Sequence, residues 1–308
     1  MKFLVVLHIY YEYMWPELKS YLMNIEDGKY DLVVTLSKSN EELQNDIIAF
    51  HKNARIILTE NRGYDVWPFI KALNNVELDK YKYLIKLHTK RDLPDESNII
   101  IDNRYFFKGR RWRSLLLSFI SSKENFDKCV KCLDEDNSVG MINHRMLLDG
   151  TKLKQKFRDK HLKYCVEEAK SLLKKIEVNI IPADRVNYIG GTMFICRASI
   201  MKPLLKLNLN SDDFVAVQRD NENELAHVME RVFGWLVTSS GFTFADPYTT
   251  RDEMISQIPE SIKCRILTFP VRHRIFSKVQ RFIFRCDKID GYREIKLFKI
   301  KLFKIKCK

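Results

Sequence analysis

Residues 54–70, ARIILTENRGYDVWPFI, hold the repeating unit that decides the fold. The apolar run 54–60 predicts a buried β-strand that ends at Asn61-Arg62-Gly63, and residues 67–74 predict a helix with Pro68 in its first turn. A short strand followed by a turn and a short helix is typical of a parallel α/β sheet.

The same alternation extends to both sides of this unit. Strands are predicted at 3–10, 30–36 and 81–87, with helices at 13–25 and 41–52 between them. Strands that alternate with helices of about ten residues predict a mostly parallel sheet flanked by helices, with three layers.

The middle of the chain is predicted to be more helical. Its predicted elements are helices at 112–133, 153–176 and 222–237, and short strands at 138–143, 179–185, 188–196 and 241–248. No internal repeat interrupts this part of the chain. The repeat in the sequence is KLFKI-KLFKI, at residues 296–305.

Composition and charge limit the classes of protein. A chain of 308 residues that is 45% hydrophobic can bury a large core, which excludes wholesale disorder. The net charge of +13 is uneven, because residues 272–308 carry 13 basic and three acidic side chains, a net of +10. The nearly neutral remainder lacks basic patches interleaved with aromatic residues, so no nucleic-acid partner is expected.

The cysteines and the amino terminus indicate a compartment. Seven cysteines and no secretory signal predict reduced thiols in the cytoplasm. Cys129 and Cys132 form a lone CxxC without a second pair at zinc spacing, so no metal role is expected for them. No window approaches the 18 apolar residues of a membrane-spanning helix.

The segment 61–70 is the first that can carry chemistry. It follows a predicted strand, and in open parallel sheets ligands bind beyond the carboxyl ends of strands. Gly63 permits a tight turn or close approach by a ligand, and Arg62 offers a planar donor for phosphate. Asp65 can accept from ligand hydroxyls. The alternative is an ordinary helix entry, with Asp65 as the cap and Arg62 in solvent.

The segment 85–92, IKLHTKRD, ends the next predicted strand. His88, Lys90 and Arg91 place an imidazole and two cations where a diphosphate could bind. The alternative is a solvated charged loop.

Two later segments are also candidates. Gly190 and Gly191 precede a predicted strand, where the backbone must turn tightly or approach a ligand; the alternative is an ordinary turn. In the helix at 222–237, His227 and Glu230 are three residues apart and therefore neighbours, which suits a general base. The alternative is a hydrogen bond on a solvated helix face.

Taken together, these segments resemble the rhamnan synthesis F family of polysaccharide glycosyltransferases. The matching motifs, in order over roughly residues 1–250, are His8-Ile9-Tyr10-Tyr11, NRGYDVWPF, KLHTKRD, SVGMI, GGTMFICRA and HVMERVFG. The resemblance implies a GT-A-like fold and transfer of a sugar from a nucleotide sugar to a growing cell-surface glycan such as capsule or O-antigen. The sugar would be rhamnose or another hexose such as galactofuranose, carried by dTDP or UDP.

The resemblance also implies roles for residues. Glu230 is the first choice for the base of an inverting displacement, with His227 tuning it or serving instead and Asp65 as the rival. The expected nucleotide-sugar contacts are His8, Tyr10, Asn61, Arg62, Gly63, Asp65, His88, Thr89 and Lys90. The residues expected where the acceptor or donor sugar approaches are Gly190, Gly191, Thr192 and Arg231.

The sequence differs from GT-A enzymes at the position where they usually bind a metal ion. Those proteins usually place Asp-x-Asp after the strand that here ends in Leu87, whereas this chain has His88-Thr89-Lys90. Because Asp-x-Asp holds a divalent cation on the diphosphate, we expect transfer without a cofactor, with Mg²⁺ or Mn²⁺ as the alternative.

The domains follow from the motifs and the charge. We expect a catalytic domain at 1–250, with a nucleotide-sugar half at about 1–100 and an acceptor half at 101–250. Residues 251–308 form a basic amphipathic extension whose predicted helix, 271–285, suits an anionic membrane surface. This tether predicts a peripheral protein on the inner face of the cell membrane that acts on a lipid-linked acceptor. The alternative function is a non-catalytic nucleotide- or glycan-binding protein held at the membrane by the same tail.

Overall fold

A computed structural model describes the chain at residues 2–93, 98–101, 105–152, 160–180, 185–216, 224–250, 252, 284–289, 292–297 and 300–306. Its contacts divide the chain into two compact units. One consists of Met1–Asp102 and Phe107–Arg251, and the other of Asn103–Phe106 and Asp252–Lys308.

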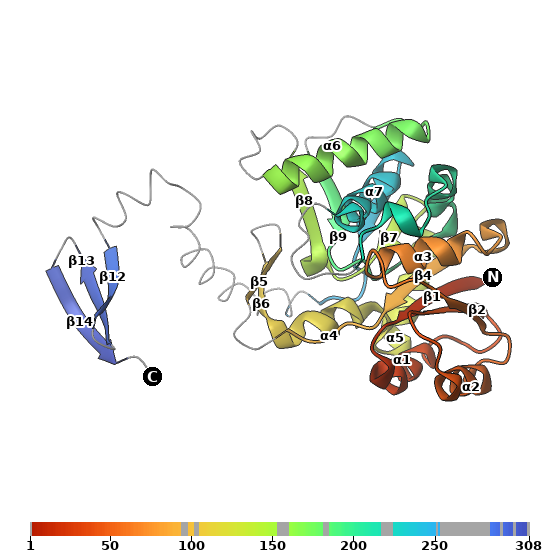
Figure 1. Ribbon diagram of the computed structural model, residues 1–308, viewed down its shortest axis with the longest axis horizontal. Coiled ribbons are helices and arrows are strands. Elements are labelled where there is room, and N and C mark those ends of the chain that lie inside the picture. The colour runs from red at the N-terminus through yellow and green to blue at the C-terminus, as the bar shows by residue number, and fades with distance from the viewer. Residues whose placement is uncertain are drawn as a thin grey trace. The chain divides into compact units, whose positions relative to one another are not determined.

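The first unit is built on a seven-stranded sheet with the order β11-β7-β10-β4-β1-β2-β3 (Figure 1). Neighbouring strands are parallel except β10, which is antiparallel to both β4 and β7. The predicted mostly parallel α/β sheet is therefore confirmed, with one reversed strand inside it. The strands are β1 (Phe3–Ile9), β2 (Tyr30–Leu36), β3 (Arg55–Leu58), β4 (Tyr83–His88), β7 (Val139–Ile142), β10 (Phe194–Arg197) and β11 (Thr243–Ala245).

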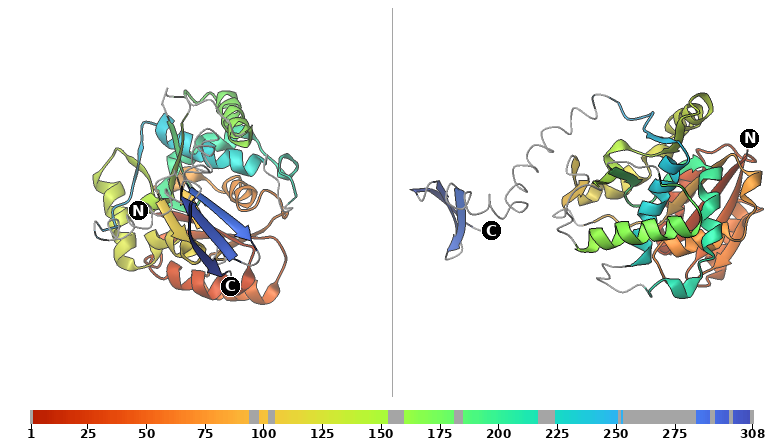
Figure 2. Two further views of the ribbon diagram at one scale, coloured as in Figure 1. Left: turned by 90° about the vertical axis from the view of Figure 1, so that its left-hand side faces the viewer. Right: turned by 90° about the horizontal axis from the view of Figure 1, so that it is seen from above.

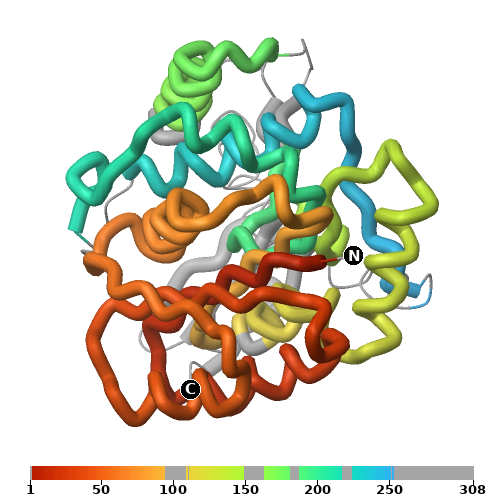
Figure 3. The backbone as a smooth tube through the Cα atoms, turned by 90° about the vertical axis from the view of Figure 1, so that its right-hand side faces the viewer, coloured from red at the N-terminus to blue at the C-terminus, as the bar shows by residue number. Residues whose placement is uncertain are grey.

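Helices cover both faces of this sheet, so its central strands are buried. Helices α3 and α7 lie on one face, with α6 beside α7, and α1, α2 and α5 lie on the other (Figures 1, 2 and 3). The α-helices are α1 (Trp15–Leu22), α2 (Glu41–Phe50), α3 (Val66–Leu73), α4 (Trp112–Leu116), α5 (Lys123–Glu135), α6 (Lys160–Lys175) and α7 (Leu225–Ser239). Every residue of β1 and β4 is buried, which agrees with the continuous apolar runs that predicted these strands.

The middle of the chain differs from the prediction in three places. The helix predicted at 112–133 is divided into α4, a 3-10 turn and α5, because the Ser122 side chain accepts from Asn125 N at 3.1 Å and starts a new helix. The strand predicted at 179–185 lies mostly outside the described residues, and β9 (Arg185–Ile189), which begins at its last residue, pairs with the unpredicted β8 (Leu148–Lys152). The first part of the helix predicted at 153–176 lies outside the described residues. Another unpredicted pair of short strands is β5 (Asn98–Ile101) and β6 (Tyr105–Lys108).

In the second unit the described residues form a three-stranded antiparallel sheet of β12 (Phe284–Ile289), β13 (Tyr292–Leu297) and β14 (Ile300–Lys306). The helix predicted at 271–285 is contradicted at its last two residues, Phe284 and Arg285, which lie in β12. Aromatic and β-branched residues favour strands, and Asp290-Gly291 is a hairpin sequence at the two positions between β12 and β13. The amphipathic helix predicted at 271–285 falls mostly outside the described residues. No helix among the described residues is long and apolar enough to cross a membrane.

Candidate functional site

The predicted motifs meet at one edge of the sheet. The carboxyl ends of β1, β3 and β4 lie there and lead into the segments that begin at Tyr10, Thr59 and Thr89. Because β10 runs in the opposite direction, the turn that precedes it, at Gly190–Thr192, lies at this same edge. One reversed strand thus brings a motif from the second half of the chain to the motifs of the first half.

A left-handed turn places Asp65 at this edge. Gly63 and Tyr64 have φ values of +57° and +53°, and Asp65 starts α3. A Cβ on Gly63 would stand 2.4 Å from the Phe214 ring, so only glycine fits against the segment that passes it. The Asp65 side chain makes no helix-capping hydrogen bond, which removes the alternative that it is an ordinary cap.

Asp65 is instead held by a lysine that the sequence reading did not single out. Lys86 lies inside β4 with only 1% of its side chain exposed, and its Nζ donates to Asp65 Oδ2. Lys86 Nζ also donates to Thr192 Oγ1 at 2.8 Å, and that hydroxyl donates to Asp65 Oδ2 at 2.5 Å. Burial alone would raise the pKa of Asp65, but His88 and Lys86 outweigh it and hold the pKa well below its usual range.

His88 fastens the glycine turn to β4. Its Nε2 donates to the Gly191 carbonyl at 2.8 Å, and Gly191 and Thr192 both have left-handed backbones, with φ values of +79° and +54°. Burial lowers the pKa of His88 to about 4, so the ring is neutral at pH 7. The geometry therefore favours His88 as a positioning group over its predicted role as a positive charge on a diphosphate.

His8 and Thr89 connect β1, β2 and β4 at the same edge. His8 Nδ1 lies 3.0 Å from Thr35 Oγ1, and burial lowers the pKa of His8 to about 3. Thr89 Oγ1 accepts from the backbone nitrogens of Tyr10 and Tyr11 at 2.9 and 3.0 Å. Tyr10 is 45% exposed, whereas His8 and Thr89 are buried, so of these three residues Tyr10 is the one that a ligand can reach.

Glu230 reaches the cluster from α7. Burial raises the pKa of Glu230; Asp65 adds to the rise, while Arg231, Lys90 and Lys86 oppose it. These mutual effects place Glu230 in the electrostatic field of the site, and its side chain is still 21% exposed. A carboxylate with a raised pKa is a better proton acceptor than an ordinary one, whereas Asp65 is a poorer one.

The partner of Glu230 differs from the one that helix spacing predicted. Arg231 Nη1 lies 3.3 Å from Glu230 Oε2 and donates to the His227 carbonyl at 2.6 Å, while its guanidinium carbon stands 4.6 Å from the centre of the Tyr188 ring. The His227 ring packs 6.0 Å from the Tyr64 ring. Arg231 therefore orients the carboxylate, and His227 lies against the turn that carries Asp65.

The remaining predicted residues lie near the same turn. Arg62 Nη1 donates to the Phe214 carbonyl at 2.9 Å, so this side chain braces the turn as well as offering charge. Asn61 is exposed and Gly190 is buried, with Gly190 N donating to Leu147 O at 2.8 Å. Lys90 is partly exposed beyond β4 and affects the pKa values of Lys86, His88 and Glu230.

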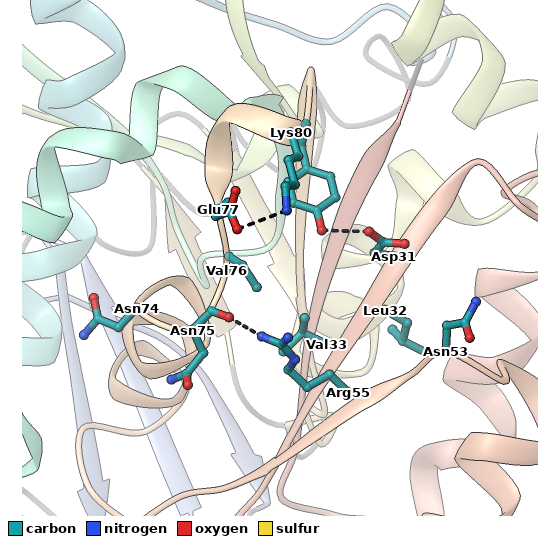
Figure 4. Close-up of a pocket in the computed structure, with 11 residues that line it drawn as sticks. Asp31, Leu32, Val33, Asn53, Arg55, Asn74, Asn75, Val76, Glu77 and Lys80 are labelled. Atoms are coloured by element: carbon teal, nitrogen blue, oxygen red, sulfur yellow. Dashed lines mark hydrogen bonds and ion pairs between the residues drawn. The ribbon is translucent and has the colours of Figure 1, made fainter.

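Two hollows lie away from this cluster. The larger, about 520 Å³, is at the amino ends of β2 and β3, where Asp31, Arg55 and Lys80 are each paired within the rim (Figure 4). The smaller, about 320 Å³, lies past the end of β7 and is mostly apolar, with Arg145 and Asp246 paired at 3.3 Å beside it. Among the described residues, no group of three or more His, Cys, Asp and Glu is placed to hold a metal ion.

Comparison with known families shows where the chain belongs. The family model described as rhamnan synthesis protein F matches residues 1–242. The chain belongs to the rhamnan synthesis protein F family. The matched range includes every segment that meets at the carboxyl edge.

Individual relatives are more distant. The uncharacterized protein WxcX of Xanthomonas campestris pv. campestris strain B100 is 26% identical over 188 residues. The aligned residues cover 59% of this chain and 24% of WxcX. The chain thus spans about a quarter of the length of the curated relatives it matches.

Solved structures give only a remote likeness. TarS 1–349 of S. aureus is 12% identical and has a TM-score of 0.39, with 92% of this chain and 78% of that one covered. Glucosyl-3-phosphoglycerate synthase of Mycobacterium tuberculosis is 10% identical with a TM-score of 0.31, covering 99% and 90%. At these scores the likeness is distant, and function is inferred from the family and the site instead.

Proposed function

We propose that the protein transfers a sugar from a nucleoside-diphosphate sugar to an intermediate of a cell-surface polysaccharide. The observation that carries this proposal is the meeting of family motifs around one carboxylate pair. Asp65 and Glu230 come from different halves of the matched region, and they have opposite pKa shifts at one edge of the sheet. Carboxylates in different environments divide the tasks of holding a substrate and moving a proton.

The reaction we propose is an inverting single displacement. An acceptor hydroxyl attacks the anomeric carbon, its proton passes to Glu230, and the bond from that carbon to the diphosphate oxygen breaks, so the nucleoside diphosphate leaves with the electron pair. The raised pKa of Glu230 supports this assignment over the rival base, Asp65, whose pKa is held low. Arg231 supports it further, because it fixes the carboxylate.

The leaving diphosphate would be stabilised by fixed positive charge. Lys90 is the candidate that geometry favours, since it is partly exposed and lies within electrostatic reach of Glu230 and His88. Arg62 would assist from the neighbouring turn. With no Asp-x-Asp at the end of β4, we propose that these cations replace a divalent metal. Activity that survives EDTA would support this, and activity restored only by Mg²⁺ or Mn²⁺ would overturn it.

The acceptor would approach the glycine turn. Gly191 is partly exposed beside Thr192, whose hydroxyl donates to the Asp65 carboxylate, whereas Gly190 is buried and the Leu116 and Trp112 side chains pack against Gly191. We propose rhamnose or another hexose such as galactofuranose as the transferred sugar, on a lipid-linked glycan of the capsule or O-antigen kind. The donor would be a dTDP- or UDP-sugar.

We also propose that residues 271–308 hold the protein at the inner face of the cell membrane. What supports this is the charge, since 13 basic and three acidic residues follow Val271. Each Lys or Arg near an anionic lipid surface contributes about 1 kcal/mol of binding. A lipid-linked acceptor would give the enzyme a reason to be there.

The experiment that tests the catalytic proposal is nucleoside diphosphate release. The protein is incubated with a panel of dTDP- and UDP-sugars, with and without total lipid extract as acceptor, and free dTDP or UDP is measured. We expect release from one donor and its loss in Glu230→Gln. Tight binding of a donor without release under any condition would favour the non-catalytic binding protein instead.

A further inference from the structure

Lys86 is the least expected side chain of the fold. It lies at the centre of the sheet, opposite Val6 on β1 and Phe194 on β10, with 1% of its side chain exposed. A buried ammonium group is costly unless it is paired and hydrogen-bonded. The partners of this ammonium group therefore indicate what the lysine does at this position.

The contacts of Lys86 converge on one oxygen atom. Its ammonium donates to Asp65 Oδ2 and to Thr192 Oγ1, and the Thr192 hydroxyl donates to that same Oδ2. The Phe69 ring, 5.3 Å from Nζ, covers another side of the ammonium group. Lys86 thus joins the turn after β3 to the turn before β10, and the closed triangle fixes the rotation of the Asp65 carboxylate.

The other carboxylate oxygen of Asp65 is left available. Among the contacts of the described residues, none is made to Oδ1, and this atom is not one of those buried without a partner. The Asp65 side chain is 17% exposed although it is tied to a fully buried lysine. With Oδ2 engaged, the exposed part of the carboxylate that can still accept a hydrogen bond is Oδ1.

We propose that Lys86 is a positioning residue that turns Asp65 so that Oδ1 is a fixed acceptor for a hydroxyl group of the nucleotide sugar, on either its ribose or its sugar ring. This inference rests on the proposed function. Lys86 does not touch the substrate. It determines which Asp65 oxygen faces the substrate, and it keeps the carboxylate charged. Thr192 completes the fixation from the glycine turn.

The groups that face Asp65 agree with a permanent acceptor. These are His8 on β1, Lys86 and His88 on β4, and Glu230 on α7, with Lys90 beyond β4 acting on Lys86, His88 and Glu230. The pKa of Asp65 lies well below its usual range, in spite of burial, because of His88 and Lys86. Such a carboxylate accepts hydrogen bonds without taking the proton, so it binds a hydroxyl and leaves proton removal to Glu230.

The first experiment needs no ligand. Full-length wild type, Lys86→Met, Asp65→Asn and the double variant are compared, with Lys82→Met as the matched control because Lys82 forms a Lys–Asp pair with Asp134 outside the site. The carboxyl carbon of Asp65 is titrated by NMR. We expect the pKa to rise by at least about one unit in Lys86→Met, a tenfold change in proton affinity, and to stay unchanged in Lys82→Met. The same titration in wild type and Lys86→Met would overturn the proposal.

The second experiment uses UDP, UDP-glucose, dTDP and dTDP-rhamnose as probes, with binding measured by calorimetry from pH 5 to 8. We expect Lys86→Met to weaken binding about ten- to hundredfold, the range for a lost hydrogen bond to a charged group, and most strongly at pH 5. Weakening for the sugar nucleotides alone indicates the sugar ring; weakening that includes UDP indicates the ribose. In the Asp65→Asn background the Lys86 change should have no further effect.

The outcomes separate the two proposals. If the wild type binds none of the probes and releases no nucleoside diphosphate from any donor, the proposed function fails, while the NMR titration still decides whether Lys86 holds Asp65 charged. If the probes bind but Lys86→Met binds them as well as wild type does at every pH, the positioning role is wrong and the function stands. If Lys86→Met does not fold, the double variant, in which both charges are removed together, is compared with Asp65→Asn alone in the same binding assay.

Discussion

Replacing Gly63 by alanine tests whether the turn before Asp65 depends on the absence of a side chain. Gly63 has a φ of +57°, and an added Cβ would stand 2.4 Å from Phe214 Cδ1 and 2.8 Å from Cγ. Ordinary carbon contacts are about 3.5–4.0 Å, so the ring or the turn must move by about 1 Å or more. Phe214 is buried and packs 5.7 Å from the Trp67 ring, so it cannot swing into solvent without loss of core contacts.

The expected magnitude has two parts. A left-handed backbone is less favourable for alanine than for glycine by about 1–2 kcal/mol. Overpacking of a buried contact adds about 1–3 kcal/mol. Gly63→Ala should therefore lower the free energy of unfolding by about 2–5 kcal/mol, which corresponds to a fall in Tm of about 4–20 °C for a unit of this size.

A matched control separates the two parts. Gly28 has a φ of +75°, but nothing lies within 4 Å of a Cβ built on it, so Gly28→Ala should show the backbone part alone. The stability of both variants is measured by thermal and urea unfolding. Their donor affinity is measured at a temperature at which both are folded. Gly63→Ala should also weaken donor binding, because Asp65 follows two residues later. Equal destabilisation in the two variants, with intact binding, would refute the reasoning.

Three further changes have definite expected outcomes. Glu230→Gln should lower kcat by about 10²–10⁴ and leave donor affinity unchanged. In the wild type kcat should fall as the pH drops through the raised pKa of Glu230, and this fall should be absent from the pH–rate profile of the variant. Gly234→Ala would place a Cβ 2.0 Å from the Asn187 carbonyl oxygen, so α7 must move away from β9. The variant should lower the free energy of unfolding, measured in urea, by about 1–3 kcal/mol. It should also lower kcat, because Glu230 lies on the same helix. A chain ending at Thr268 should no longer sediment with anionic liposomes while keeping donor hydrolysis, and equal sedimentation would contradict the tether.

The first half of the fold was predictable from sequence because its signals are local. Continuous apolar runs gave the strands β1, β2 and β4, and the helices between them have ordinary starts, such as Asn40, whose side chain accepts from Leu43 N at 3.1 Å. Strand direction after β4 was not predictable in this way. Whether β10 runs parallel or antiparallel depends on how long connections pack, and no local pattern encodes that.

The candidate site was predictable in its residue types but less so in its contacts. Asp65, His88 and Glu230 were identified from turns and spacing, and Thr192 from the family resemblance. Lys86, which bonds to both Asp65 and Thr192, was missed because it is a single charge within a strand. The signal was present: YLIKLH is apolar on both sides of that lysine, and a charge at the centre of a fully buried strand requires a buried partner.

The tail shows the limit of helical pattern reasoning. Residues 271–285 have the spacing of an amphipathic helix, but Phe284 and Arg285 at its end lie in β12. The described residues between 284 and 306 pair as antiparallel strands, which the helical spacing of the preceding segment does not predict.

The reversed direction of β10 has a consequence for protein engineering. The chain leaves β10 at the edge opposite the site, where Ala198 N donates to Lys82 O at 3.1 Å just before β4 begins. Ser199, the next residue, is exposed there. A fluorophore attached at Ser199 would therefore report unfolding of the central sheet while leaving the opposite, ligand-facing edge chemically untouched, whereas a label at the other end of the same strand would sit beside Thr192.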